Sequence, residues 1–139
     1  MQTIRTNESG FTYIELACFG LIVVVLAIVG LSAYASAQSS VRDRQRVSEV
    51  TQLQSALKSF YEQNLDFPNS NNGYPTDFSS YVKWPNPPGP ADGACTSEQN
   101  RYYYTKISST DYGIAFCLGD QVGNYRAGVR KATPADGIR

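Results

Sequence analysis

The chain has 139 residues, which is enough for one small domain and one membrane segment. Lys and Arg together number 12, as do Asp and Glu, so the net charge of zero excludes a bulk electrostatic attraction to nucleic acid. The chain has no His, the commonest general base and metal ligand, so we predict that it is not an enzyme and holds no metal or other cofactor.

The N-terminal region begins with a short motif and then becomes almost wholly apolar. Residues 10–16 read Gly-Phe-Thr-Tyr-Ile-Glu-Leu, and after Glu15 no charged residue occurs before Arg42. The apolar run over residues 16–35 is long enough to cross a bilayer as a helix. A carboxylate at the bilayer centre costs about 2.5–3.5 kcal/mol, so we predict that Glu15 is functional.

Two other interpretations of this region stay open. Glu15 lies near the start of the apolar run, so its carboxylate could reach the membrane interface instead of acting inside the bilayer. The small residues 32–37 could also imitate the cleavage site of a secretory signal, which would leave Glu15 unexplained.

Apolar residues continue beyond the membrane segment at steps of three and four. This amphipathic pattern, together with the absence of Pro before Pro68, predicts one helix over residues 11–64, about 80 Å long at 1.5 Å per residue. Its apolar stripe consists of Val47, Val50, Leu53, Leu57, Phe60 and Tyr61.

Residues 65–100 are rich in Asn, Gly and Pro, which predicts a long loop. Within it, Thr76 or Asp77 is expected to start a short helical turn that ends near Lys83. Its aromatic side chains are expected to pin the loop to the domain, the alternative being a glycan pocket or an adhesion surface. They are Phe67, Tyr74, Phe78, Tyr81 and Trp84.

Residues 101–131 show the alternation of a small sheet, with strands predicted at 101–107, 111–118 and 124–131. The tail over residues 133–138 is expected to leave the sheet. One face of the middle strand is expected to be buried, with Tyr112, Ile114, Phe116 and Leu118 on it. The predicted fold class is therefore α+β, a long N-terminal helix packed on a small antiparallel sheet.

The cysteines and charges give three further expectations. If the polar part is exported, Cys95 and Cys117 are predicted to form a disulfide, the alternative being two free thiols. Three basic residues, Arg126, Arg130 and Lys131, form a weakly supported candidate patch for DNA, the alternative being ordinary solvated charge. The scattered residues Asp111, Asp120 and Asp136 lack the spacing of a calcium site.

The motif around Gly10, Phe11 and Glu15, followed by the amphipathic helix, resembles the N-terminus of type IV prepilins. The resemblance to this family covers Phe11 to about Pro68, and residues 44–61, followed by residues 64–68, are also similar to the helix-to-loop region of small major pseudopilins of type II secretion. The leader departs from the family, since Glu8 and Ser9 stand where many prepilins carry Lys or Arg. Ser32, close to Gly30, replaces the helix-breaking Pro of many pilins.

The resemblance implies a domain organisation and a processing step. Residues 1–10 would be a leader, removed between Gly10 and Phe11 by a prepilin peptidase that also methylates Phe11. Residues 11–64 would be the pilin helix, with 11–35 as its hydrophobic part. Residues 65–139 would be a globular head, made of the loop 65–100, the sheet 101–131 and a C-terminal tail.

The implied function is that of a structural subunit of a type IV pilus. The prepilin would lie in the cytoplasmic membrane, meet the inner-membrane assembly machinery and polymerise with other pilin subunits into an extracellular filament for adhesion, motility or DNA uptake. Phe11 and Glu15 would act in assembly, since the family's Glu is thought to meet the N-terminal amine of a neighbouring subunit. The alternatives are a type II secretion pseudopilin and a single-pass membrane-anchored binding domain.

The expected orientation in the membrane rests on the resemblance rather than on charge. Arg42, Arg44 and Arg46 follow the apolar run, whereas Arg5 is the only basic residue before it. Counting these charges alone would place the C-terminal side in the cytoplasm. We follow the resemblance, which places the C-terminal domain outside, where a disulfide can persist.

Overall fold

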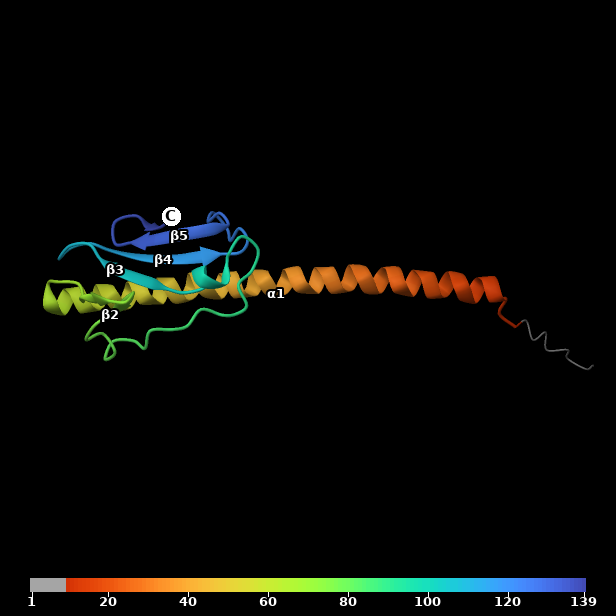
Figure 1. Cartoon of the computed structure of the whole chain (residues 1–139), viewed down its shortest axis with the longest axis horizontal. Helices are drawn as coiled ribbons and strands as arrows, with labels where there is room; N and C mark the ends of the chain where they lie inside the picture. Colours follow the sequence, from red (N-terminus) through yellow and green to blue (C-terminus); the bar gives the residue numbers. More distant parts are fainter. Residues whose placement is uncertain (1–9) are drawn as a thin grey trace, which may run out of the picture. The chain divides into compact units, whose positions relative to one another are not determined.

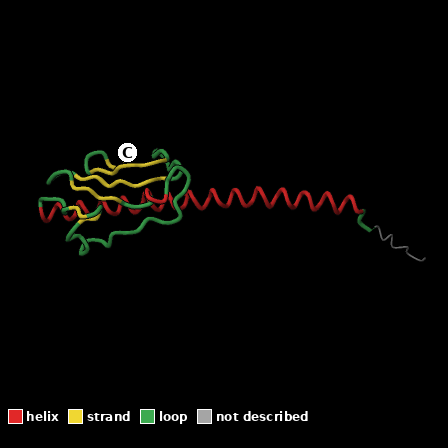
Figure 2. Tube along the Cα trace, in the orientation of Figure 1, coloured by secondary structure: helices red, strands yellow, loops and turns green. Residues whose placement is uncertain are grey.

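The computed structural model describes residues 10–139, apart from the side chain of Ser32. The predicted leader, except for Gly10, therefore lies outside the described residues. Contacts divide the chain into two units, Met1–Ser36 and Ala37–Arg139. The fold is α+β, as predicted: one long helix is followed by a small antiparallel sheet (Figures 1 and 2).

The helix α1 spans Tyr13–Asn64, two residues shorter at its start than the predicted 11–64. No Pro interrupts it, and it passes through Gly30 without a break. It ends at Asn64, because the next residue, Leu65, has a left-handed φ of 54° that turns the chain while its amide donates to the Tyr61 carbonyl. The helix therefore ends where the turn-forming residues of the loop begin.

The sheet contains four strands in the order β3-β4-β5-β6, all antiparallel. They are β3 (Tyr103–Lys106), β4 (Tyr112–Leu118), β5 (Gly128–Thr133) and β6 (Gly137–Ile138). The third predicted strand begins later than expected, because Val122 and Tyr125 pair across a tight turn. The expectation that the tail leaves the sheet is wrong, since β6 pairs with β5 at Ala132 and Thr133.

The core lies between the sheet and the C-terminal part of α1, along which β3, β4 and β5 run (Figure 1). The helix contributes Val50, Leu53 and Leu57, each at most 1% exposed. The predicted face of β4 meets them: Tyr112, Ile114, Phe116 and Leu118 are all buried. The apolar stripe of the helix and the apolar face of β4 thus bury each other, as expected when an amphipathic helix packs on a sheet with one apolar face.

The opposite face of β4 is also largely covered, which simple alternation did not predict. Cys117 is buried, and so is Gly113, over which the Lys131 side chain lies. A Cβ at Gly113 would meet the stem of Lys131, so glycine leaves room for that side chain.

The segment between α1 and β3 contains the short hairpin of β1 (Ser70–Asn71) and β2 (Tyr74–Pro75), and the 3-10 helix η1 (Ser97–Gln99). The predicted helical turn near Lys83 is instead a turn closed by the Tyr81 amide on the Phe78 carbonyl. Phe67 and Phe78 are buried, and Tyr81 and Trp84 are half-buried, as expected of packing residues. Tyr74 is 52% exposed, so the expectation that it pins the loop is wrong.

Candidate functional site

The N-terminal part of α1 presents an unbroken apolar surface. Every large apolar side chain from Phe11 to Leu31 is exposed, including Phe19 at 66% and Leu26 at 65%. Soluble monomers rarely leave so large a contiguous apolar surface uncovered. The helix is also long and apolar enough to cross a membrane, so it is a candidate membrane anchor.

Glu15 lies in the first turn of this helix and takes part in its N-terminal cap. The Thr12 hydroxyl accepts a hydrogen bond from the Glu15 amide at 3.4 Å, and the Glu15 carboxylate accepts one from the Thr12 amide at 3.5 Å. This reciprocal pair is a capping box, which satisfies two amides that the helix itself leaves unpaired. The negative charge also opposes the positive end of the helix dipole.

The cap leaves the predicted cleavage site outside the helix. Gly10, Phe11 and Thr12 precede α1, and the Phe11 side chain is 84% exposed. The structure brings together the two predicted assembly residues, since Phe11 and Glu15 line one shallow pocket with Leu16 and Phe19. Sequence reasoning missed the cap, although the spacing Thr-x-x-Glu at the start of an apolar run is its signature.

A second candidate site is a cluster of charged side chains that anchors the head on α1. Asp43 and Arg46 have exposed fractions of 0% and 1%, respectively, and pair at 2.6 Å. Asp92, on the loop before η1, accepts from the Nε and Nη2 of Arg42 at 2.8 and 2.6 Å. Arg46 also reaches Asp92, at 3.3 Å. The cluster therefore joins two helix arginines to two carboxylates through four ion contacts.

Backbone groups provide partners for most of the remaining hydrogen-bond donors and acceptors of this cluster. The Asp43 carboxylate accepts from the amides of Gly119 and Asp120, at 3.0 and 2.8 Å. Arg46 donates to the carbonyls of Pro88 and Pro90, at 2.7 and 2.9 Å. These bonds tie both the proline-rich loop and the end of β4 to one turn of the helix, so burial of the charges is compensated.

The pairing shifts the pKa values of Asp92 and Arg42. Hydrogen bonds from Arg42 hold the pKa of the Asp92 carboxyl below its ordinary value of 3.8, and burial opposes only part of that effect. The same hydrogen bond raises the pKa of Arg42. Asp92 therefore stays ionised under conditions in which an exposed carboxyl would begin to take up a proton.

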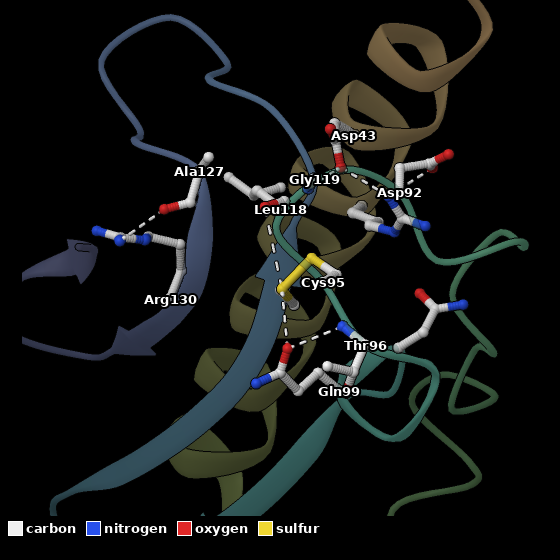
Figure 3. Close-up of a disulfide and its surroundings, with 12 residues drawn as sticks. Asp43, Asp92, Cys95, Thr96, Gln99, Leu118, Gly119, Ala127 and Arg130 are labelled. Carbon is white, nitrogen blue, oxygen red and sulfur yellow. Dashed lines mark hydrogen bonds and ion pairs between the residues drawn. A yellow bond between two sulfur atoms is a disulfide. The ribbon is translucent and has the colours of Figure 1, made fainter. Parts of the chain in front are cut away.

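The Cys95–Cys117 disulfide lies next to the charged cluster (Figure 3). The predicted pairing is confirmed, with the two Cα atoms 5.8 Å apart. Between the cysteine and the cluster, Gly93 packs on the backbone of Gly119 so closely that a Cβ would overlap the Gly119 carbonyl. The disulfide and this contact hold the Asp92 loop against the end of β4, and a cross-link of this loop size stabilises a fold by about 3 kcal/mol.

The three basic residues of the candidate DNA patch do not form one surface. Arg130 pairs across the sheet with the buried Phe116, and Lys131 pairs with Ala115. Because consecutive residues of a strand point to opposite faces of the sheet, the side chains of Arg130 and Lys131 lie on different faces of β5. Arg130 is half-buried and donates to the Ala127 carbonyl at 3.0 Å (Figure 3). Arg126 is exposed in the preceding turn. This arrangement gives no basis for developing the DNA interpretation further.

Two of the three scattered aspartates, Asp120 and Asp136, are held by separate partners. Asp120 accepts from Ser39 at 3.0 Å, whereas Asp136 pairs with Arg139 at 2.7 Å. Within residues 10–139, no group of three His, Cys, Asp or Glu side chains is arranged to hold a metal ion.

No protein-family model, no curated protein and no solved structure matches the chain. The resemblance of its N-terminal motif to prepilins therefore stays a prediction.

Proposed function

We propose that this protein is a structural subunit of a type IV pilin-like filament. The observation that carries the proposal is the exposed apolar surface of α1 from Phe11 to Leu31, on a chain that also has a folded head. Such a surface needs a bilayer before assembly and other copies of the same helix afterwards. On this proposal the protein has no catalytic role, and its partners are its own copies and the inner-membrane assembly machinery.

Glu15 favours a polymer over a simple anchor. Within residues 10–36 it is the only charged residue, and an unpaired carboxylate in an apolar environment costs several kcal/mol. Cleavage by the prepilin peptidase after Gly10 would give Phe11 a cationic amine, methylated or free. Pairing between this amine and Glu15 of a neighbouring copy would set the register of assembly, while apolar contacts would supply most of the cohesion.

The capping box gives a second possible role for Glu15, besides charge pairing. One substitution distinguishes the two roles. Gln serves in a capping box as Glu does, so Glu15→Gln keeps the cap and removes the charge. We expect Glu15→Gln and Glu15→Ala both to be processed at Phe11 but to fail to form filaments. Thr12→Val, which weakens the cap and keeps the charge, is the matched control and should assemble. Normal filaments from Glu15→Gln would show that Glu15 acts only as a cap.

Processing and location are tested by peptide mass spectrometry on filaments sheared from the native cell. An abundant peptide that begins at Phe11, with or without a methyl group, supports an extracellular pilus. The same peptide confined to the membrane fraction would indicate a pseudopilin of type II secretion instead. An intact N-terminus in every fraction would contradict the proposal and leave a membrane-anchored domain.

A further inference from the structure

The β1–β2 hairpin ends in a turn that consists of Asn72 and Gly73. Asn71 pairs with Tyr74 across the hairpin, so these two residues form its whole loop. Both have left-handed backbones, with φ of 51° and 84°, as the two central positions of a type I′ turn require. Asn72 is exposed, and no other group among residues 10–139 hydrogen-bonds its side-chain amide.

Asn72 and Gly73 together form a reactive pair. The backbone nitrogen that follows an Asn can attack the carbonyl carbon of the Asn side chain, and a side chain on the attacking residue hinders this approach. Gly73 has no side chain, so its nitrogen can reach the Cγ of Asn72 without that hindrance. No other Asn of the chain precedes a Gly.

We propose that Asn72 is a site of spontaneous deamidation, with the Gly73 nitrogen as nucleophile and water as the only co-reactant. In the first step the Gly73 nitrogen loses its proton and bonds to the Asn72 Cγ, while the Cγ–Nδ2 bond breaks and ammonia leaves with a proton. In the second step water opens the five-membered imide at one of its two carbonyls. The product is aspartate or, where the chain continues through Cγ, isoaspartate, and neither step changes an oxidation state.

Ring closure needs the turn to open, because a closed type I′ turn fixes the backbone dihedral angles on both sides of the reacting peptide bond. The hairpin favours such opening, since β1 and β2 have only two residues each and hairpins of this size are marginally stable. Short loops with few hydrogen bonds are the parts of a fold that open most readily. The reaction therefore needs only the folded head, and it proceeds whether or not the chain assembles into a filament.

Two other positions, Asp92-Gly93 and Asp136-Gly137, have the same arrangement with an acid in place of the amide. An ionised carboxylate is a poor target for a nucleophile, and an opposite charge nearby favours the ionised form. Asp92 is paired with two arginines of the charged cluster, and Asp136 is paired with Arg139 at 2.7 Å. The contacts of the folded head thus protect both acids and leave Asn72 as the reactive position.

Deamidation has a structural consequence, because Gly73 joins the hairpin to β3. Its carbonyl accepts from the Tyr104 amide at 2.8 Å, and the Tyr103 ring covers it so closely that a Cβ there would overlap the ring. Isoaspartate adds a methylene group to the backbone just before Gly73, which displaces both contacts. Tyr104 is 0% exposed, so water does not easily replace the lost partner of its amide. We expect the modified hairpin to detach from β3.

Mass spectrometry of the full-length protein, incubated in detergent at mildly alkaline pH, tests the reaction. Each conversion raises the mass of the peptide that contains Asn72 by about one dalton, because an amide is replaced by an acid. Asn124 is the internal control, since it is also exposed in a turn but precedes Tyr125. We expect conversion at Asn72 to be about tenfold or more faster than at Asn124. Equal rates at the two residues would overturn the proposal.

Asn72→Gly is the matched variant, because Gly-Gly also forms type I′ turns and offers no side-chain amide. It should show no mass change in this peptide, while its near-ultraviolet circular dichroism stays that of the wild type. A gain of about one dalton in the same peptide of Asn72→Gly would assign the reaction to Asn69 or Asn71 and overturn the assignment to Asn72.

Hydrogen exchange at the Tyr104 amide tests the consequence for β3. In the isoaspartate fraction, separated by chromatography, we expect this amide to exchange about tenfold faster than in fresh protein. Asn72→Asp carries the same charge on an unaltered backbone, so its Tyr104 amide should exchange as in the wild type. Unchanged exchange in the isoaspartate fraction would show that the hairpin stays attached and would overturn the expected detachment.

Discussion

The Asp92 carboxylate and the Arg42 guanidinium form a two-point ion pair across 50 residues of sequence, with distances of 2.8 and 2.6 Å. Asp92 is three residues before Cys95, whose disulfide partner Cys117 is the penultimate residue of β4, and Arg42 is near the start of the helix section that the head covers. One loop residue therefore links the helix, the disulfide and the sheet.

Asp92→Asn should destabilise the head by about 2–3 kcal/mol, because the variant leaves the charges of Arg42 and the buried Arg46 without one of their two carboxylates. Thermal unfolding of the full chain in detergent, followed by near-ultraviolet circular dichroism, measures the change. Glu62→Gln removes a carboxylate from an exposed pair and should change the stability by less than about 0.5 kcal/mol. Equal effects of the two substitutions would contradict the importance of the Asp92 cluster.

Acid should weaken the head through the same residue. Because the pKa of Asp92 is lower in the folded protein than its ordinary value of 3.8, its contribution is fully present above that value. As the pH falls below about 4, the unfolded chain takes up a proton first, so stability decreases until the folded pKa is passed. Unfolding curves at a series of pH values should show a shallower acid loss in Asp92→Asn than in the wild type. An identical slope in both would show that other carboxyls control the acid sensitivity.

Gly93→Ala should cost more than the same substitution at Gly123, although both glycines have left-handed backbones, with φ of 48° and 56°. A Cβ at Gly93 would overlap the Gly119 carbonyl, whereas one at Gly123 meets nothing within 4 Å. We expect about 1 kcal/mol for the backbone strain at Gly123 and about 1–3 kcal/mol more for the overlap at Gly93. Chemical denaturation of both variants measures the difference. Equal costs would mean that the loop shifts to accommodate the methyl group.

Alkali should destabilise the head through its buried tyrosines. Burial raises the pKa of Tyr112 to about 12, and it also raises the pKa of Tyr104. The stability that the neutral phenols contribute is present below pH 10 and is lost as the pH rises towards the folded values. Phenolate absorbance should therefore rise in two steps, the second together with unfolding. Tyr112→Phe should reduce the alkaline loss of stability, and Tyr74→Phe, at an exposed site, should not.

Local patterns were enough to predict the elements that depend on nearby residues. The three- and four-residue spacing of Val50, Leu53 and Leu57 predicted the helix that the structure shows, because a helix places such residues on one face. The two-residue alternation in β4 predicted its buried face in the same way. The Thr12–Glu15 cap was equally local and could have been predicted, since its signature depends on four consecutive residues.

Strand pairing at the C-terminus could not be read from such patterns. β6 has only two residues, Gly137 and Ile138, too few to show any period. What makes it a strand is the neighbouring edge of β5, which supplies the hydrogen bonds, and that edge exists only once the sheet has formed.

The sequence by itself determined the long apolar helix, the position of Glu15 within it and the α+β class, because each follows from the order of residues along a short stretch. It also showed three arginines, at positions 42, 44 and 46, interrupted by Asp43 and Gln45. The Asp43–Arg46 pair is local to one turn of the helix, but only the tertiary structure decided that Asp92 holds Arg42 and Arg46 while Arg44 remains exposed. The physical reason is that a charge is compensated by whatever lies within a few ångströms of it, and the loop that carries Asp92 reaches the helix only through the folded head.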